Sequence, residues 1–244
     1  MESPDLPAPI HWIFFDCFNT LLDDFDEAGD ETGMKPISHI PVEAGFFTSP
    51  LEFHQTYLNW RTNYWDSSHW KEMPLRSRFL AVLQATEGKY SVEDLNHTCD
   101  QMMDAFHQTF PNEVRLAPGV ITMLNRLDGR VHMGVVSNFF LPGYPASMLK
   151  ELDLDKYFDF ILDSAQLGIK KPGIEIYKNA ISLADIGTGN LDQILFIGDN
   201  LINDVLTPIE LGMRGIHFDR SAERGGTASP PQVPSITHWS QFSL

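Results

Sequence analysis

The sequence predicts an α/β fold in which a parallel sheet carries helices on both faces and a small all-helical domain is inserted after the first strand. Two observations support this prediction. Short apolar runs alternate with segments of helical periodicity through the second half of the chain, and one long segment near the start offers helices with no strand between them. With 244 residues, of which 43% are hydrophobic, the chain can bury a substantial core.

Five apolar runs indicate buried strands, because they are rich in β-branched or aromatic residues and too short for typical helices. They are Ile10–Phe15, Val131–Val136, Phe158–Leu162, Ile194–Ile197 and Gly215–Phe218. Apolar residues at helical spacing lie between these runs, in Gly119–Leu127, Ser147–Leu152, Ile174–Leu183 and Asn203–Leu211. Strands that alternate with helices predict a Rossmann-like, doubly wound parallel sheet with helices on both faces.

The inserted domain is predicted from a segment that offers helices alone, from about Asp23 to Pro111. Its apolar residues recur at helical spacing in two groups, at Phe53, Tyr57, Trp60 and Tyr64, and at Leu95, Cys99, Met102, Met103, Phe106 and Phe110. Ser91 is a suitable N-cap for the second helix. The stretch Asp23–Gly45 is rich in acidic residues and glycine, which predicts a solvated linker. We therefore predict a core domain of residues 1–22 and 112–244 and a helical domain of residues 23–111.

Charge and cysteine content restrict the partners and the compartment. The formal net charge is −16 and the 17 basic residues form no cluster, so no nucleic-acid partner is expected. Cys17 and Cys99 supply no disulfide framework, and the first residues lack the pattern of a signal peptide, so we expect a reducing, cytoplasmic setting. No apolar stretch approaches the roughly 18 to 20 residues that span a bilayer, so no membrane association is expected. The sequence leaves the oligomeric state open.

Polar residues follow the predicted strands at the points where they end. Asp16 ends the first strand, Ser137 and Asn138 end the second, and Asp199 follows the fourth. Lys171 opens the helix that follows the third strand. Because the carboxyl ends of neighbouring parallel strands meet at one crevice, these residues are expected to form a single site despite their distance in the sequence.

The chemistry of this predicted site is that of a carboxylate nucleophile. Several carboxylates, from Asp16, Asp199 and Asp204, would raise one another's pKa unless a cation compensates, and Mg²⁺ prefers such oxygen ligands. Lys171 can keep the nucleophile ionised and neutralise a substrate oxyanion. Ser137 offers a hydroxyl donor to the same anion. The pattern predicts attack by Asp16 on a small anionic substrate.

The order of these residues resembles the haloacid dehalogenase superfamily of aspartate-nucleophile hydrolases. The matching positions are Asp16 and Thr20, Ser137 and Asn138, Lys171 and Pro172, and Gly198 and Asp199 with Asp204. The inserted helices fall where that family carries its helical cap. The resemblance implies that Asp16 forms a covalent ester that water then hydrolyses. It also implies substrate contacts from Thr20, Asn138 and Phe18, and a magnesium site formed by Asp16, Asp199 and Asp204 with the backbone carbonyl of Phe18.

Phe18 departs from the pattern of the family's phosphatases, whereas Asp199 and Leu201 depart from that of its dehalogenases. The family's phosphatases usually have an aspartate where this chain has Phe18, and that aspartate protonates the leaving group and then activates water. The family's 2-haloacid dehalogenases have an aromatic residue there, and Arg61 resembles their substrate-gripping arginine. However, those dehalogenases have serine where this chain has Asp199 and asparagine where it has Leu201, and they work without metal.

Asp199 and Asp204 outweigh Phe18 in this comparison, because a buried unpaired charge costs more than a missing proton donor. The preferred hypothesis is a magnesium-dependent phosphohydrolase that acts on a small phosphorylated metabolite through an aspartyl-phosphate intermediate. The alternatives are a metal-independent (S)-2-haloacid dehalogenase and a catalytically degenerate binding protein. His54 and His69 are candidate proton donors, and Lys170 is expected on the surface.

Overall fold

The computed structural model describes residues 9–24, 33–67, 69–86, 88, 90–224 and 228–244. A six-stranded sheet forms its centre, with the order β5-β4-β1-β6-β7-β8 and every neighbouring pair parallel. The strands are β1 Trp12–Phe15, β4 His132–Ser137, β5 Phe160–Asp163, β6 Ile194–Gly198, β7 Arg214–Phe218 and β8 Ser235–Ile236. All five predicted strands are present, and the short edge strand β8 is an addition.

The helices of the sheet region alternate with its strands, as predicted. They are α6 Val120–Leu127, α7 Tyr144–Glu151, η2 Asp155–Tyr157, α8 Ser164–Leu167, α9 Ile174–Leu183, η3 Thr188–Gln193, η4 Leu201–Leu206, α10 Thr207–Glu210, α11 Ser221–Arg224 and η5 Trp239–Gln241. The predicted helix Asn203–Leu211 begins earlier, because the Asn200 side chain accepts hydrogen bonds from the backbone N–H groups of Ile202 and Asn203.

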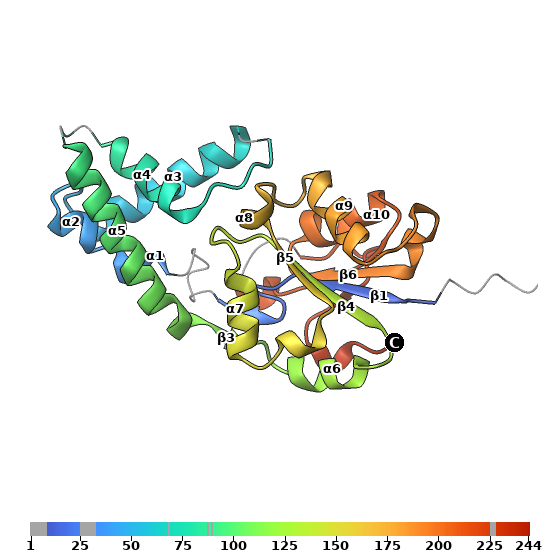
Figure 1. Ribbon diagram of the computed structural model, residues 1–244. Coiled ribbons are helices and arrows are strands. Elements are labelled where there is room, and N and C mark those ends of the chain that lie inside the picture. The colour runs from blue at the N-terminus through green and yellow to red at the C-terminus, as the bar shows by residue number, and fades with distance from the viewer. Residues whose placement is uncertain (1–8, 25–32, 68, 87, 89, 225–227) are drawn as a thin grey trace, which may run out of the picture.

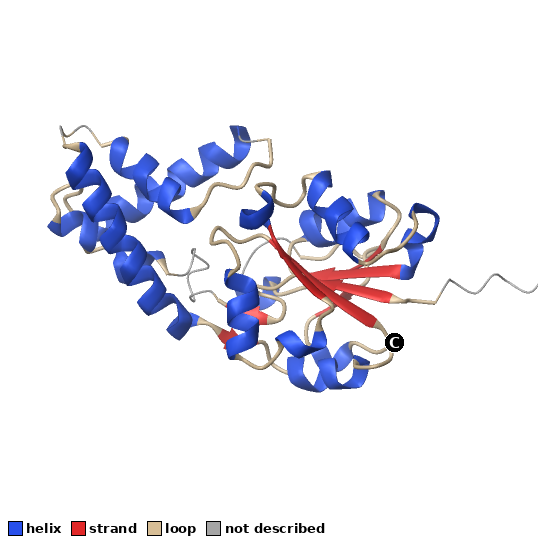
Figure 2. Cartoon of the chain, viewed as in Figure 1, coloured by secondary structure: helices blue, strands red, loops and turns tan. Residues whose placement is uncertain are grey.

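Both faces of the sheet are covered, which explains the uninterrupted apolar run in β1 (Figures 1 and 2). Ile13 and Phe15 point to the core that packs against α6 and α7. Trp12 and Phe14 point to the opposite face, where they belong to the core formed with α9. Alternate residues of one strand therefore enter two cores, so both sets must be apolar.

Residues 34–113, which we call the helical segment, contain helices and no strand where the structure describes them. Its elements are α1 Met34–Ile37, α2 Ile40–Glu43, α3 Pro50–Ser67, α4 Leu75–Gln84, α5 Val92–Thr109 and η1 Phe110–Glu113. Ser91 caps α5 as predicted, in a reciprocal capping box with Asp94. Figure 1 shows α1 to α5 gathered beyond the end of the sheet toward which β1 runs. The division into two domains at residues 22/23 and 111/112 stays a prediction.

The linker predicted for Asp23–Gly45 is wrong where the structure describes it. Met34 and Ile37 of α1 are fully buried. Residues 25–32 of this stretch lie outside the described residues. The acidic composition of this stretch led to the wrong prediction, because α1 is short and its apolar residues belong to the main core.

An antiparallel pair of two-residue strands, β2 Leu22–Asp23 and β3 Arg115–Leu116, was not predicted. It brings together the two chain crossings between the sheet and the helical segment. Elements of two residues carry no measurable periodicity, so the sequence pattern could not show them. The pair places the next residue, Asp24, at the wall of the cavity described below.

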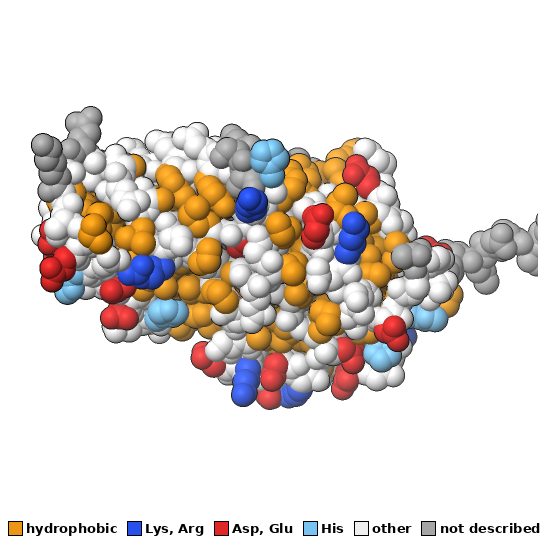
Figure 3. All heavy atoms as spheres, turned by 45° about the horizontal axis from the view of Figure 1, so that its top comes forward, with side chains coloured by type: hydrophobic (Ala, Val, Ile, Leu, Met, Phe, Trp, Pro, Cys, Tyr) orange, Lys and Arg blue, Asp and Glu red, His pale blue; other side chains and the backbone are white. Residues whose placement is uncertain are grey.

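Two further observations concern the surface. No helix among the described residues has the length and apolarity needed to cross a bilayer. On the face shown in Figure 3, Lys and Arg side chains are scattered among acidic and hydrophobic ones. This face therefore lacks the continuous basic stripe that binds a nucleic-acid backbone.

Candidate active site

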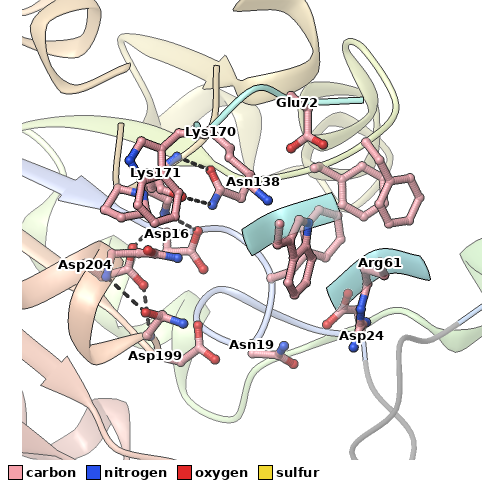
Figure 4. A pocket seen from close by; sticks show the side chains of 18 of the residues that line it. Asp16, Asn19, Asp24, Arg61, Glu72, Asn138, Lys170, Lys171, Asp199 and Asp204 are labelled. Atoms are coloured by element: carbon pink, nitrogen blue, oxygen red, sulfur yellow. Dashed lines mark hydrogen bonds and ion pairs between the residues drawn. The ribbon is translucent and has the colours of Figure 1, made fainter. Parts of the chain in front are cut away.

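A cavity of about 460 Å³ lies between the carboxyl ends of the strands and the helical segment (Figure 4). The sheet side of its wall includes Asp16, Lys171, Asp199 and Asp204. The helical segment contributes Arg61, Trp65, Trp70, Glu72 and Arg78. This volume is typical of a site for a small-molecule ligand.

The strands bring the predicted residues together because they end at the same level. Phe15 is in register with Val135 of β4 and Ile197 of β6. The backbone N–H of Asp16 donates to the Ile197 carbonyl at 2.9 Å, so the sheet still fixes the residue that follows β1. Asp16 and Asp199 therefore enter the crevice side by side, as the sequence predicted.

Lys171 is the centre of the charged network. Its Nζ donates at 2.7 Å to Asp16 Oδ1, to Asp204 Oδ1 and to the Val136 carbonyl. Burial lowers the pKa of Lys171, but the charges of Asp16 and Asp204 outweigh burial and raise this pKa above its ordinary value. Lys171 is therefore a permanent cation that binds one oxygen of Asp16 and leaves Oδ2 for chemistry.

Three carboxylates form the predicted metal site. Oxygen atoms of Asp16, Asp199 and Asp204 lie within 4.8 Å of one another. Burial, followed by the charges of Asp16 and Asp204, raises the pKa of Asp199 well above its ordinary value. Burial likewise raises the pKa of Asp204 to about 6, against the lowering effect of Lys171. With all three ionised, the carboxylates exceed the Lys171 ammonium by two negative charges, so hard oxygen ligands and net charge both fit Mg²⁺.

The turn after β6 positions Asp204. The backbone N–H of Asn200 donates to Asp204 Oδ2 at 3.0 Å. A Cβ atom at Gly198 would lie only 2.3 Å from the same oxygen. Glycine at 198 is therefore required for Asp204 to pack over the end of β6 and reach Lys171.

Phe18 takes part in an aromatic cluster at the cavity wall. Its side chain is 7% exposed, and its ring stacks on Phe139 with centroids 4.3 Å apart. Phe110 of η1 lies 6.1 Å from Phe18, centroid to centroid. The position of the missing proton donor is thus a packing contact between the sheet region and the helical segment. The metal contact predicted for the Phe18 carbonyl stays a prediction.

Asn138 lines the cavity, but its amide is occupied. Its Nδ2 donates to the Lys171 carbonyl at 2.9 Å, and its Oδ1 accepts from the Lys171 backbone N–H at 2.7 Å. Asn138 therefore fixes the main chain of Lys171, and the substrate contact predicted for it stays a prediction.

Two predicted residues lie outside the cavity wall. Ser137 and Thr20 are both fully buried, and their hydroxyls have no hydrogen-bond partner among the described residues. The Thr20 carbonyl accepts from Trp239 Nε1 at 3.1 Å. Thr20 therefore has the surroundings of a core residue. The catalytic role of Ser137 stays a prediction.

The cavity also contains residues that the sequence pattern missed. Lys170, expected on the surface, is 6% exposed and lines the cavity, so that expectation was wrong. Trp70 and Glu72 come from the loop between α3 and α4, where no periodic pattern marks them. The candidate donors His54 and His69 are not among the residues that line the described cavity.

Asp16, Lys171, Asp199 and Asp204 gathered at the carboxyl edge of a parallel sheet fit a hydrolase, and the comparisons agree with that class. Residues 61–217, more than half of the chain, match the family model "Haloacid dehalogenase-like hydrolase". The chain belongs to the haloacid dehalogenase-like hydrolase family.

One distant relative and two solved structures match most of the chain. Pyrimidine 5′-nucleotidase YjjG of Escherichia coli is 24% identical over 83% of this chain and 83% of its own. Among solved structures, 2-haloacid dehalogenase from Pseudomonas syringae has a TM-score of 0.70 at 19% identity, covering 95% of this chain and 96% of its own. The magnesium-bound hydrolase YfnB from Bacillus subtilis has a TM-score of 0.64 at 16% identity, with coverage of 96% and 97%. These two structures support the fold alone.

Proposed function

We propose that this hydrolase is a magnesium-dependent phosphohydrolase that acts on a small phosphorylated metabolite through an aspartyl-phosphate intermediate. One observation carries the proposal: the carboxylates of Asp16, Asp199 and Asp204 exceed the Lys171 charge by two. A divalent cation removes that excess and allows a phosphate to approach. The curated relative named as a nucleotidase supports the same reaction class.

In this reaction Asp16 Oδ2 attacks the phosphorus atom while Lys171 holds Oδ1. The bond from phosphorus to the leaving-group oxygen breaks, and that oxygen takes a proton from solvent water, because Phe18 offers none. Water then attacks the aspartyl phosphate and releases phosphate, which restores the Asp16 carboxylate. Mg²⁺, held by Asp16, Asp199 and Asp204, would supply positive charge to the phosphoryl oxygens. We propose that the helical segment acts as the cap that covers this chemistry.

A metal-independent haloacid dehalogenase is the second candidate, favoured by Phe18 and by Arg61 in the cavity wall. A halide leaves without a proton, so an aromatic residue at 18 suits that reaction. Asp199 opposes it, because without a metal ion a carboxylate substrate would approach three carboxylates that Lys171 compensates only in part. The cytoplasmic setting stays a prediction of the sequence.

Phosphate release from p-nitrophenyl phosphate tests the proposal. Turnover is expected with Mg²⁺ and not in excess chelator, and Asp16→Asn should reduce it by at least about 10⁴-fold, since the nucleophile is removed. Asp153→Asn is the matched control, because this side chain is 81% exposed and should leave turnover unchanged. Halide release from 2-chloropropionate without metal, in the absence of phosphate release, would support the dehalogenase instead.

A further inference from the structure

Two tryptophans in the cavity wall are unusually exposed. Trp65 of α3 is 38% exposed, and Trp70 of the α3–α4 loop is 46% exposed. The other aromatics of the same wall, Phe18, Phe139 and Phe140, are between 5% and 7% exposed. Trp65 and Trp70 are therefore the aromatic side chains of this wall that keep a large exposed area, whereas the phenylalanines mainly pack against one another.

Trp70 has an unfavourable backbone conformation that its contacts maintain. Its φ is 65°, and that of the preceding His69 is 49°. Left-handed backbone angles are unfavourable for bulky residues and persist only where surrounding contacts enforce them. Here the Trp70 carbonyl accepts from the Lys170 backbone N–H at 2.9 Å. A Cβ atom at Gly173 would lie 3.1 Å from the Trp70 Cβ, so glycine at 173 allows this close approach.

Trp65 is positioned by two cations. The Arg61 guanidinium carbon lies 4.7 Å from the centroid of the Trp65 ring, and Lys170 Nζ lies 4.4 Å from it. Both distances are within the range of cation–π attraction. Lys170 thus contacts both tryptophans, Trp65 through its ammonium group and Trp70 through its backbone, and links them to the neighbouring Lys171.

The charges in this part of the cavity are mixed. Asp24 and Glu72 line the same wall as Arg61, Lys170 and Arg78, and Glu72 binds Arg78 at 2.8 Å. Figure 4 shows Asp24 beside Arg61. The acidic side chains therefore have basic neighbours, and this part of the wall has no large excess of either charge. A planar, uncharged ring gains stacking area there without needing an ionic partner.

We propose that Trp65 and Trp70 form a subsite that stacks a planar aromatic ring in the leaving group of the substrate. The substrate class is then a phosphate monoester of a ring-bearing alcohol. This inference rests on the proposed phosphohydrolase function and specifies its substrate. The cavity volume of about 460 Å³ is sufficient for such a molecule.

Matched substrates test the subsite by activity. Uridine and adenosine 5′-monophosphates carry a ring, glycerol 3-phosphate does not, and all three release a primary alcohol, so proton demand is similar. We expect kcat/KM to be higher for the nucleotides, and Trp70→Ala to lower the nucleotide-to-glycerol ratio about 5- to 100-fold, the usual effect of losing a stacked ring. Trp70→Phe should keep most of the ratio. Leu51→Ala, an exposed apolar residue of α3 outside the cavity wall, is the matched control.

Binding of uridine and adenosine, which carry no phosphate, separates this inference from the proposed function. Saturable quenching of tryptophan fluorescence is expected, and it should weaken about 5-fold or more in Trp65→Leu and Trp70→Leu. Saturable quenching without any phosphate release would leave the subsite standing and contradict the phosphohydrolase. Phosphate release with equal kcat/KM for all three esters, and quenching that these two variants do not change, would overturn the subsite alone.

Discussion

Phe18 occupies the position from which most phosphatases of this family transfer a proton, and the structure shows what the ring does there. It stacks on Phe139 of the sheet region and lies 6.1 Å from Phe110 of the helical segment, centroid to centroid. A carboxylate at this position would lose these contacts and add a negative charge beside Asp16. Packing and proton transfer therefore compete at a single residue.

Phe18→Asp and Phe18→Asn separate these two effects, because the variants have nearly the same shape and only one can transfer a proton. Both should lower the free energy of unfolding by about 3 to 5 kcal/mol, as expected for removal of a buried phenylalanine. The Asp variant should hydrolyse glycerol 3-phosphate about 10²-fold faster than the Asn variant, or more, if general acid–base catalysis is restored. Urea denaturation and phosphate release measure the two quantities. Equal rates would mean that proton transfer is not the missing function.

The turn from β6 into η4 positions two of the three carboxylates that could hold a metal ion. Asp199 follows the strand directly, and Asp204 returns to it because Gly198 leaves room for the carboxylate. Asn200 supports both ends of the turn: its side chain caps η4, and its backbone N–H binds Asp204. The position of Asp204 beside Asp199 therefore depends on Gly198, which has no side chain that could take part in the reaction.

Gly198→Ala is expected to displace Asp204, because the new Cβ would lie 2.3 Å from its Oδ2. The Mg²⁺ concentration for half-maximal activity should rise about 10- to 100-fold, the usual result of disturbing the support of a metal ligand. Gly187→Ala is the matched control, since a Cβ atom there meets nothing within 4 Å. Magnesium titration of phosphate release measures the change, and an unaltered midpoint would show that Asp204 tolerates the methyl group.

Strands and loops differ in how far the sequence predicts the residues of the site. Buried parallel strands are continuous apolar runs, so β1, β4 and β6 were predictable together with the polar residues at their ends, such as Asp16 and Asp199. Lys171 and Asp204 were identified by their place in the order of the family's motifs. Trp70, Glu72 and Lys170 were not, because they lie in loops whose place depends on contacts between distant segments. Asn138 was found, but only its partners reveal a positioning contact. Periodicity identifies strand ends and does not place the side chains of loops.

Glu72, at the cavity wall, joins the helical segment to the sheet region and also forms a buried ion pair within the helical segment. Glu72 binds Arg78 of α4 at 2.8 Å, and both side chains are 3% exposed. Its other oxygen accepts from Ser164 Oγ of α8 at 2.8 Å, and its backbone N–H donates to the Gly168 carbonyl at 3.0 Å. One carboxylate therefore links the loop that carries Trp70 both to its own segment and to the sheet region.

Glu72→Gln should destabilise the protein by about 3 to 5 kcal/mol, because it leaves the Arg78 charge buried without its ionic partner. Urea denaturation measures this loss, and the double variant Glu72→Gln/Arg78→Met should recover part of it, since both charges are then removed. Asp100→Asn is the matched control: its pair with Arg76 is exposed, and the change should cost about 1 kcal/mol or less. If Glu72→Gln cost no more than Asp100→Asn, Glu72 would not hold the two parts of the molecule together. The position of Trp70 over the cavity would then depend on the backbone hydrogen bonds of its loop alone.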